Sequence, residues 1–203
     1  MIDARRSQRL DAAVAHLATR TSVVGVVGDI TDASHRAELA RVAASLGTVG
    51  LLVNNASTLG ASPLPDLDEI EPETFLRIFD VNVVAPFVLV HDLGELLDER
   101  ATIVNVTSDA AVEPYPGWGG YGASKAALEH ASRVLAVERP DLRVLVVDPG
   151  DMRTEMHQDA FPDDDISDRP EPETRVPALL VLIEGDFPSG RYEASAFAAA
   201  GTR

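Results

Sequence analysis

Two kinds of apolar pattern alternate along the chain, and together they predict helices that alternate with strands. From Leu10, apolar side chains recur at positions i, i+3, i+4 and i+7, which predicts a helix over residues 7–17. Ser22–Val27 is instead a continuous, β-branched run, which predicts a buried strand. The same two patterns predict further helices over residues 34–46, 71–97, 121–138 and 176–184, and further strands over residues 49–53, 101–107, 142–147 and 191–194.

Strands that are apolar along their whole length are buried on both faces, which is typical of a parallel sheet covered by helices. The alternation therefore predicts an α/β fold in three layers, with a doubly wound parallel sheet in the middle. A chain of 203 residues can bury a substantial core, so we expect a single domain over residues 1–203. Such sheets bind ligands beyond the carboxyl ends of their strands, where most of the polar candidates below lie.

Residues 153–175 differ in composition from the rest of the chain. They contain Asp163, Asp164 and Asp165 in a row, and prolines at positions 162, 170 and 172. Two interpretations remain open, namely a flexible substrate loop over the site and a disordered acidic segment.

Composition narrows the classes of function. The formal net charge of −16 argues against nucleic acid and anionic membranes as partners. The sequence has neither a signal peptide at its N-terminus nor a long apolar run, so a soluble, cytoplasmic protein is expected. The chain has no cysteine and its histidines lack metal-ligand spacing, so neither disulfides nor a metal site is expected.

The stretch from Ser108 to Lys125 carries the strongest candidate chemistry. Ser108 ends the predicted strand over 101–107, and Tyr121 begins the predicted helix over 121–138. Tyr121 and Lys125 are four residues apart, so their side chains share one helix face. Lys125 is the only lysine among 17 basic residues, which favours a position that needs a compact ammonium group. We therefore expect a hydroxyl, a phenol and an ammonium to converge.

These three groups suit proton transfer to or from a substrate oxygen. A free phenol has a pKa of about 10, and a neighbouring ammonium favours the phenolate, so a lowered pKa is predicted for Tyr121. Ser108 would hydrogen-bond an oxygen on which charge develops. The alternative interpretation is a solvated Lys125 on a helix flank beside a packed tyrosine.

Tyr121-x-x-x-Lys125, with Ser108 thirteen residues before the tyrosine, resembles the short-chain dehydrogenase/reductase family. Further stretches are similar to motifs of that family. Asn54-Asn55-Ala56-Ser57 resembles its Asn-Asn-Ala-Gly, with Ser57 in place of the glycine. The stretch from Pro149-Gly150 through Met152 to Thr154 resembles its Pro-Gly-x-Val-x-Thr. The resemblance implies a Rossmann-like fold for the whole chain.

The resemblance also implies roles for individual residues. Tyr121 would be the general acid/base, Ser108 would orient the substrate oxygen, and Lys125 would bind the nicotinamide ribose and lower the tyrosine pKa. Asn82, at an interruption of the predicted helix 71–97, would hold a water that relays protons. The implied cofactor contacts are Asn54, Asn55 and Ala56 at the adenosine half, Asp29 and Ile30 at the adenine, and Pro149, Gly150, Met152 and Thr154 at the nicotinamide carboxamide. For Asp29, a helix cap remains an open alternative.

The turn Ala4-Arg5-Arg6 bears on the choice of cofactor. Family members that prefer NAD have an acid at the position of Ala4, where it binds the ribose hydroxyls. Alanine followed by arginine resembles the NADP pattern, in which Arg5 and Arg6 pair with the 2′-phosphate. An ordinary charged first helical turn is the alternative. We expect NADP rather than NAD.

One motif of the family is missing from these 203 residues: there is no Gly-x-x-x-Gly-x-Gly turn to hold the pyrophosphate. If Ala4-Arg5-Arg6 ends the second strand of the family fold, the first βα unit is absent. We therefore expect a Rossmann-like fold with a truncated first unit. Two explanations remain open: a longer natural protein, or a complete chain that has lost ordinary cofactor binding.

The function implied by the resemblance is that of an NADP(H)-dependent oxidoreductase with a Ser-Tyr-Lys-Asn catalytic set. It would interconvert a small-molecule carbonyl and the corresponding alcohol by hydride transfer, and would form a homodimer or homotetramer. The alternative is a catalytically silent fragment, or a binding or regulatory protein without a competent cofactor site. The related epimerase and dehydratase activities are a third possibility, for which little chain remains after Thr154.

Overall fold

The structure is a computed structural model that describes residues 1–197. The chain divides into two compact units. The first comprises Met1–Val49 and Val84–Asp98, and the second comprises Gly50–Val83 and the chain from Glu99 onward. The single domain over residues 1–203 stays a prediction.

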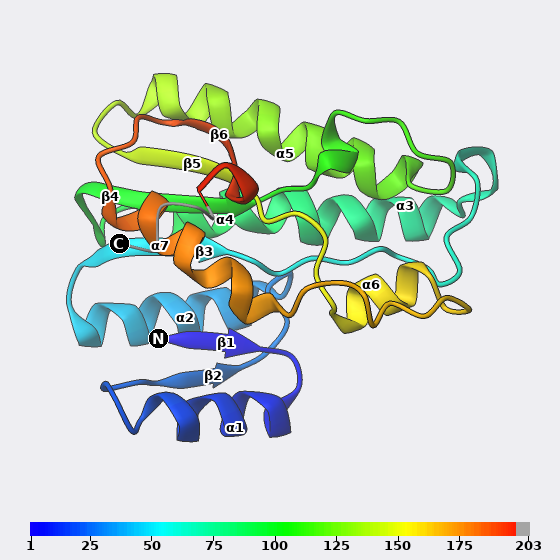
Figure 1. Cartoon of the computed structure of the whole chain (residues 1–203). Coiled ribbons are helices and arrows are strands. Elements are labelled where there is room, and N and C mark those ends of the chain that lie inside the picture. Colours follow the sequence, from blue (N-terminus) through cyan, green and yellow to red (C-terminus); the bar gives the residue numbers. More distant parts are fainter. Residues whose placement is uncertain (198–203) are drawn as a thin grey trace. The chain divides into compact units, whose positions relative to one another are not determined.

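The first unit is a two-stranded parallel sheet with three helices (Figure 1). Its elements are β1 (Ile2–Ala4), α1 (Ser7–Leu17), β2 (Gly25–Val27), α2 (Ala33–Leu46) and α4 (Ala85–Asp92). The buried Leu10 of α1 packs over Gly25, where a Cβ atom would lie only 2.7 Å from a Val14 methyl group. Glycine therefore lets α1 approach β2 closely. The predicted helix over residues 7–17 is confirmed at both ends.

Asp32 explains where α2 begins. Its carboxylate accepts hydrogen bonds from the backbone N–H and the hydroxyl of Ser34, which satisfies an otherwise unpaired donor of the first turn. Asp32 is therefore the N-cap residue of α2.

The second unit contains a four-stranded sheet in the order β3-β4-β5-β6. The strands are β3 (Val49–Asn54), β4 (Leu97–Val106), β5 (Arg143–Asp148) and β6 (Gly190–Glu193). The pairings β4–β5 and β5–β6 are parallel. The helices of this unit are α3 (Pro72–Phe79), α5 (Gly119–Glu138), α6 (Glu155–Ala160) and α7 (Val176–Glu184), and a π-helical turn (Asp80–Val84) follows α3.

Alternate residues of β4 and β5 face opposite helices. Val104 and its partner Leu145 form one buried cluster with Leu182 of α7. The next residue, Asn105, donates a hydrogen bond to Ser132 of α5 at 2.8 Å. The sheet of the second unit therefore lies between α7 and α5 (Figure 1). The predicted α/β class, with a parallel sheet inside helical layers, is confirmed.

The predicted helix over residues 71–97 is wrong at its C-terminal end. α4 ends at Asp92 and a turn follows, in which the N–H groups of Leu93 and Leu97 donate to the carbonyls of Leu89 and Leu93. β4 begins at Leu97, four residues before the predicted start at Ala101. Apolar residues continue through this turn, so periodicity does not mark the boundary.

Part of the stretch 153–175 is regular structure. Thr154 caps α6 by accepting a hydrogen bond from the backbone N–H of His157, and a short 3-10 helix spans Pro172–Arg175. Neither element is predicted from the sequence. The flexibility of this segment stays a prediction.

The helical stretch Pro72–Asp92 is long and apolar enough to cross a membrane by length and composition. Core helices of soluble proteins meet the same criteria, so the stretch is weak support for a membrane span. The expected absence of a membrane partner stays a prediction.

Candidate active site

Ser108, Tyr121 and Lys125 come together in the second unit. Ser108 follows β4 and caps a 3-10 turn over Asp109–Ala111, where it accepts a hydrogen bond from the Ala110 N–H at 3.2 Å. α5 carries the other two residues one turn apart. A Cβ atom at Gly122 would lie 2.5 Å from the Ala110 carbonyl oxygen, so only glycine lets the Ser108 turn approach α5 this closely.

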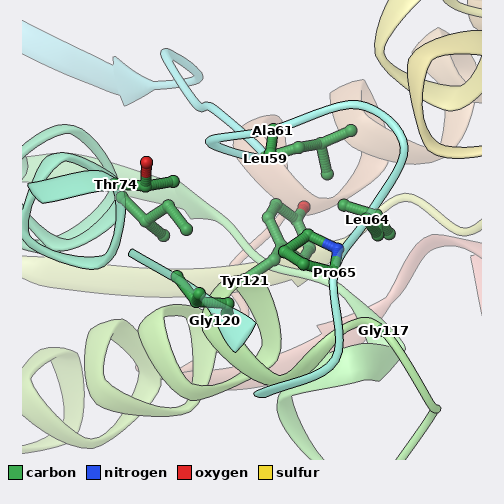
Figure 2. A pocket seen from close by; sticks show the side chains of 10 residues that line it. Leu59, Ala61, Leu64, Pro65, Thr74, Gly117, Gly120 and Tyr121 are labelled. Carbon is green, nitrogen blue, oxygen red and sulfur yellow. The ribbon is translucent and has the colours of Figure 1, made fainter. Parts of the chain in front are cut away.

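The ring of Tyr121 is held by packing on both of its sides. On one side is a narrow apolar pocket whose walls include Leu59, Leu64 and Pro65 (Figure 2). On another side the ring meets Trp118 edge-on, with 5.6 Å between ring centroids. Tyr121 and Leu59 also line a second, much larger pocket. The phenol is therefore fixed in position at the wall of that larger pocket.

Burial raises the pKa of Tyr121 to about 12, and hydrogen bonds with the Ser57 and Ser108 side chains partly oppose this rise. The sequence predicts a lowered pKa from the neighbouring Lys125. In the structure the pKa of Tyr121 is raised rather than lowered, because the cost of burying a phenolate exceeds the stabilisation from its neighbours. The phenol is thus strongly held in its protonated form.

The Lys125 amine is also buried, with 2% of the residue exposed. It donates to the Val106 carbonyl at 2.8 Å and lies 5.5 Å from the centroid of the Tyr121 ring. Burial lowers the pKa of Lys125 to about 8. This burial excludes the alternative of a solvated lysine on a helix flank, and Lys125 also lines the larger pocket.

Asn82 is buried within the π-helical turn, and its amide joins three parts of the second unit. Its Oδ1 accepts from the Thr58 N–H at 2.8 Å and from the Ser57 hydroxyl at 3.1 Å. Its Nδ2 donates to the Thr58 carbonyl at 3.0 Å and to Ser124 at 2.9 Å. These bonds use the full capacity of a primary amide. A relay water at Asn82 stays a prediction, and the side chain as placed does not offer a site for it.

The larger pocket lies wholly within the second unit and has a volume of about 660 Å³. The predicted catalytic residues Ser108, Tyr121 and Lys125 line it. The predicted cofactor residues that also line it are Asn55, Pro149, Gly150, Met152 and Thr154. The remaining walls include the aromatic residues Tyr115, Trp118, His157 and Phe161, and the charged residues Asp109, Asp148, Asp151 and Arg169.

Other predicted cofactor residues lie elsewhere. Asn54 donates to Asn105 at 2.7 Å, a bond between β3 and β4 rather than a contact with the pocket, and Ala56 is exposed. Four more belong to the first unit: Arg5, Arg6, Asp29 and Ile30. Asp29 accepts from the N–H and hydroxyl of Thr31 and does not cap α2, so the helix-cap alternative is wrong.

Sequence reasoning missed two residues of the pocket, Ser57 and Asp148, and the arginine that pairs with Asp148. Ser57 stands in place of the glycine of the related motif, and its hydroxyl donates to Asn82 at 3.1 Å. Asp148 lies at the pocket wall, where Arg191 pairs with it at 3.2 Å. Arg191 also binds the buried Glu129 of α5 at 3.0 Å. The position of Asp148 directly before Pro149-Gly150 was the one feature of the sequence that could have indicated it.

Within residues 1–197, no group of three or more histidine, aspartate or glutamate side chains is arranged to hold a metal ion. The larger pocket brings the Ser108 hydroxyl, the Tyr121 phenol and the Lys125 amine together with aromatic and charged residues. Such a set can move a proton to or from an oxygen without a metal ligand.

Comparison with known proteins gives a match over most of the chain. The sequence model described as short chain dehydrogenase matches residues 1–165. An uncharacterized oxidoreductase of Saccharomyces cerevisiae is 36% identical over 133 residues, which are 64% of this chain and 52% of that protein. Sepiapterin reductase of Bos taurus is 32% identical over 148 residues, which are 71% of this chain and 52% of that protein. The chain thus spans about half the length of these curated relatives.

Solved structures match more extensively. A putative short chain dehydrogenase of Shigella flexneri, complexed with NADP, gives a TM-score of 0.86 at 25% identity and covers 95% of this chain and 84% of that chain. A putative short chain dehydrogenase of Escherichia coli CFT073, complexed with NADPH, gives 0.84 at 28% identity, with the same coverage of 95% and 84%.

Proposed function

This chain belongs to the short-chain dehydrogenase family, and from that premise we propose that it is an NADP(H)-dependent oxidoreductase that interconverts a carbonyl and an alcohol. One observation carries the proposal. The buried phenol of Tyr121 lies at the wall of the larger pocket, and the buried Lys125 amine lies 5.5 Å from the centroid of its ring. A phenol and an amine are rarely buried together without a shared chemical task, because each loses hydration there.

The chain's own residues would handle the proton. In the reducing direction, Tyr121 gives its hydroxyl proton to the carbonyl oxygen as that oxygen becomes an alcohol. Its raised pKa keeps the phenol protonated at neutral pH, so the acid form is always ready. Ser108 would hydrogen-bond the same oxygen, on which negative charge develops. In the oxidising direction these roles reverse, and phenolate takes the proton from the alcohol.

The cofactor would supply the hydride when bound. Residues of the pocket suit such a group. Among the residues that the structure describes, the Val106 carbonyl is the one hydrogen-bond acceptor of Lys125, so two of the three amine hydrogens remain for a ligand. Thr154, Asn55 and the Pro149-Gly150 backbone share this pocket. The NADP and NADPH bound to the two bacterial relatives, together with Arg5 and Arg6, support NADP over NAD.

The substrate would be an uncharged carbonyl compound with an apolar or ring-shaped body. Trp118 and Phe161, 5.9 Å apart between centroids, form an aromatic wall of the pocket. Asp148 pairs with Arg191 and Asp151 pairs with Arg169, so the Asp109 carboxylate is the charge of the pocket that would oppose an anionic substrate. We expect a neutral aryl ketone to be reduced faster than its para-carboxylate, which has the same shape and one added charge.

Cofactor binding is the decisive experiment, and Trp118 makes it direct. It is the only tryptophan of the chain and it lines the pocket, so its emission should be quenched by bound NADPH. We expect micromolar affinity for NADPH and weaker binding of NADH. Absence of quenching at millimolar NADPH would overturn the proposal and favour a catalytically silent binding protein.

Turnover then tests the proton donor. We expect Tyr121→Phe to lower the rate of carbonyl reduction by about a thousandfold, because the proton donor is lost. Phenylalanine keeps the ring packing, so NADPH binding by Trp118 quenching should stay unchanged. Retained turnover in this variant would contradict the role of Tyr121.

A further inference from the structure

Among residues 1–197, Arg175 is the one arginine of the segment 153–175 without a carboxylate partner. The other two, Arg153 and Arg169, each pair with a carboxylate. In the part of the chain that the structure describes, the one hydrogen bond of the Arg175 guanidinium runs from Nη2 to the Asp151 carbonyl at 3.2 Å. A guanidinium has five N–H donors, so most of them remain unused here.

The Nε atom of Arg175 is a buried donor without an acceptor. Of the buried side-chain nitrogen and oxygen atoms in the described chain, it is the one that has no hydrogen-bond partner. Such an atom costs stability, so a buried donor in a folded protein is normally satisfied by the protein, by water or by a ligand. Because the group is a cation, the acceptor that suits it best is an anion. Arg175 as a whole is only partly buried, so it remains within reach of a ligand.

Arg175 is also the N-cap residue of α7. The first turn of a helix has a partial positive charge, and the N-cap position favours aspartate, asparagine, serine and threonine rather than a cation. The first turn of α7 contains no acid, and no side chain caps it. Two positive groups thus lie together without an anion between them, which indicates that an anion is bound there in the working protein.

The guanidinium of Arg175 lies beside the wall of the larger pocket. A Cβ atom added at Gly150 would lie 3.6 Å from Nη2 of Arg175, in van der Waals contact. Gly150 and Asp151 both line the larger pocket, and they follow the carboxyl end of β5. The carboxylate of Asp151 pairs with Arg169 at 3.6 Å rather than with Arg175. A cation without an ionic partner therefore lies where parallel sheets bind their ligands.

We propose that Arg175 binds a phosphate group of the cofactor, namely the pyrophosphate that adjoins the nicotinamide ribose. Phosphate oxygens match the fork of a guanidinium, which can donate two parallel hydrogen bonds to them. The stretch from Pro149-Gly150 to Thr154 would contact the nicotinamide, so the nearest phosphate of a dinucleotide held there is the pyrophosphate. At a net charge of −16, the protein needs a local cation to hold that group. The inference rests on the proposed function for the identity of this ligand, and on the contacts of Arg175 alone for the presence of an anion site.

Two reduced nicotinamides that differ by one phosphate test the contact without turnover. Dihydronicotinamide mononucleotide has the phosphate and dihydronicotinamide riboside lacks it, and quenching of Trp118, which lines the pocket, measures the affinity for each. We expect the wild type to bind the mononucleotide about ten- to a hundredfold more tightly than the riboside, because a hydrogen bond to a charged group is gained. Arg175→Met keeps the aliphatic stem and should remove this preference, whereas the affinity for the riboside stays the same.

Two further variants control for charge and for folding. Arg139→Met removes the same charge from the same unit, at an exposed pair with Asp141 after the end of α5, and should leave the preference unchanged. Arg175→Gln keeps a donor for the Asp151 carbonyl but has no charge, so it should lose most of the preference even if Arg175→Met does not fold. Far-ultraviolet circular dichroism confirms the fold of each variant. A preference for the mononucleotide that persists in Arg175→Met or in Arg175→Gln would overturn the proposal.

Inorganic pyrophosphate separates a failure of this inference from a failure of the proposed function. A ligand that binds the folded state stabilises it, so pyrophosphate should raise the melting temperature of the wild type and not that of Arg175→Met or Arg175→Gln. If neither nicotinamide binds the wild type but this difference is seen, the proposed function fails and the anion site stands. If both nicotinamides bind equally well and pyrophosphate has no effect, the anion site fails and the proposed function stands. The absence of all binding would overturn both.

Discussion

Lys125 and Glu129 lie one turn apart on α5, and the protein surrounds their charged groups in opposite ways. The Glu129 carboxylate accepts from Thr107 at 2.7 Å and from Arg191 at 3.0 Å, and Arg191 also binds Asp148. The Lys125 amine is as deeply buried, and among residues 1–197 it donates to one carbonyl, that of Val106. Two buried charges one helical turn apart thus differ in their partners: the Glu129 carboxylate has an ionic partner, whereas the Lys125 amine keeps unused hydrogen-bond donors.

The difference separates a structural charge from a functional one. A buried ion with a full set of partners is stable in one arrangement, and it has nothing left to offer a ligand. A buried amine with unused donors costs stability, and that cost is lower when a ligand binds. Removing the cation that pairs with Glu129 should therefore lower the free energy of unfolding, whereas removing the charge of Lys125 should raise it.

Arg191→Met should have the largest effect. The buried carboxylates of Glu129 and Asp148 would lose their cation, and we expect the free energy of unfolding at pH 7 to fall by about 3–5 kcal/mol. Urea denaturation measures it. The loss should shrink in acid, because burial already raises the pKa of Asp148 and a protonated carboxyl needs no cation. A loss below about 1 kcal/mol would mean that the cluster is not structural.

Lys125→Met should have the opposite sign and a smaller effect. Methionine fills a similar volume without a charge, so the variant should be more stable than the wild type at pH 7. The folded-state pKa of Lys125 is about 8, below its ordinary 10.5. Above pH 10.5 the amine is neutral in both the folded and the unfolded protein, so it costs no stability. As the pH falls through 8 the buried amine becomes charged, and that stability is lost.

The stability of the wild type relative to Lys125→Met should therefore rise by about 3 kcal/mol between pH 8 and 10.5. The raised pKa of Tyr121 acts in the other direction between pH 10 and 12, but it is present in both proteins and cancels. Thermal melts of the pair at several pH values give the difference directly. A difference that does not change with pH would show that the amine is hydrated.

Arg41→Ala should have the smallest effect and marks the baseline of the comparison. Arg41 pairs with Glu38 at 2.6 Å, but both side chains are exposed. Water screens such a pair, and holding two long side chains in one geometry costs entropy. We expect no change in melting temperature beyond experimental error, and a clear loss would contradict the division between exposed and buried charges.

The sequence was sufficient for the parts of the fold that depend on local pattern. The helices over residues 7–17 and 176–184 are confirmed at both ends because their apolar periodicity stops where their packing stops. The convergence of Ser108 with Tyr121 and Lys125 followed from a strand end, a turn and one helix face. Where apolar residues continued through a turn, as after Asp92, the boundary was lost.

The electrostatics of the site could not be predicted in this way. The sequence predicts an ammonium beside a phenol, which lowers the pKa of the phenol. The depth of burial decides whether that pKa is in fact raised or lowered, and burial depends on the whole fold. Arg191 lies 62 residues from Glu129 in sequence, so no local pattern connects them. Ser57 resembled a tolerated substitution because its partner Asn82 is 25 residues away.

The amide of Asn82 has a consequence for the order in which the protein folds. Its four hydrogen bonds join the loop at Thr58, the π-helical turn and α5, segments separated by 24 and 42 residues. Such long-range contacts form late, after the intervening chain has been closed into loops. The bond network around Tyr121 is therefore complete only when all three segments have docked. Recovery of turnover after dilution from urea would accordingly mark the end of folding in this unit.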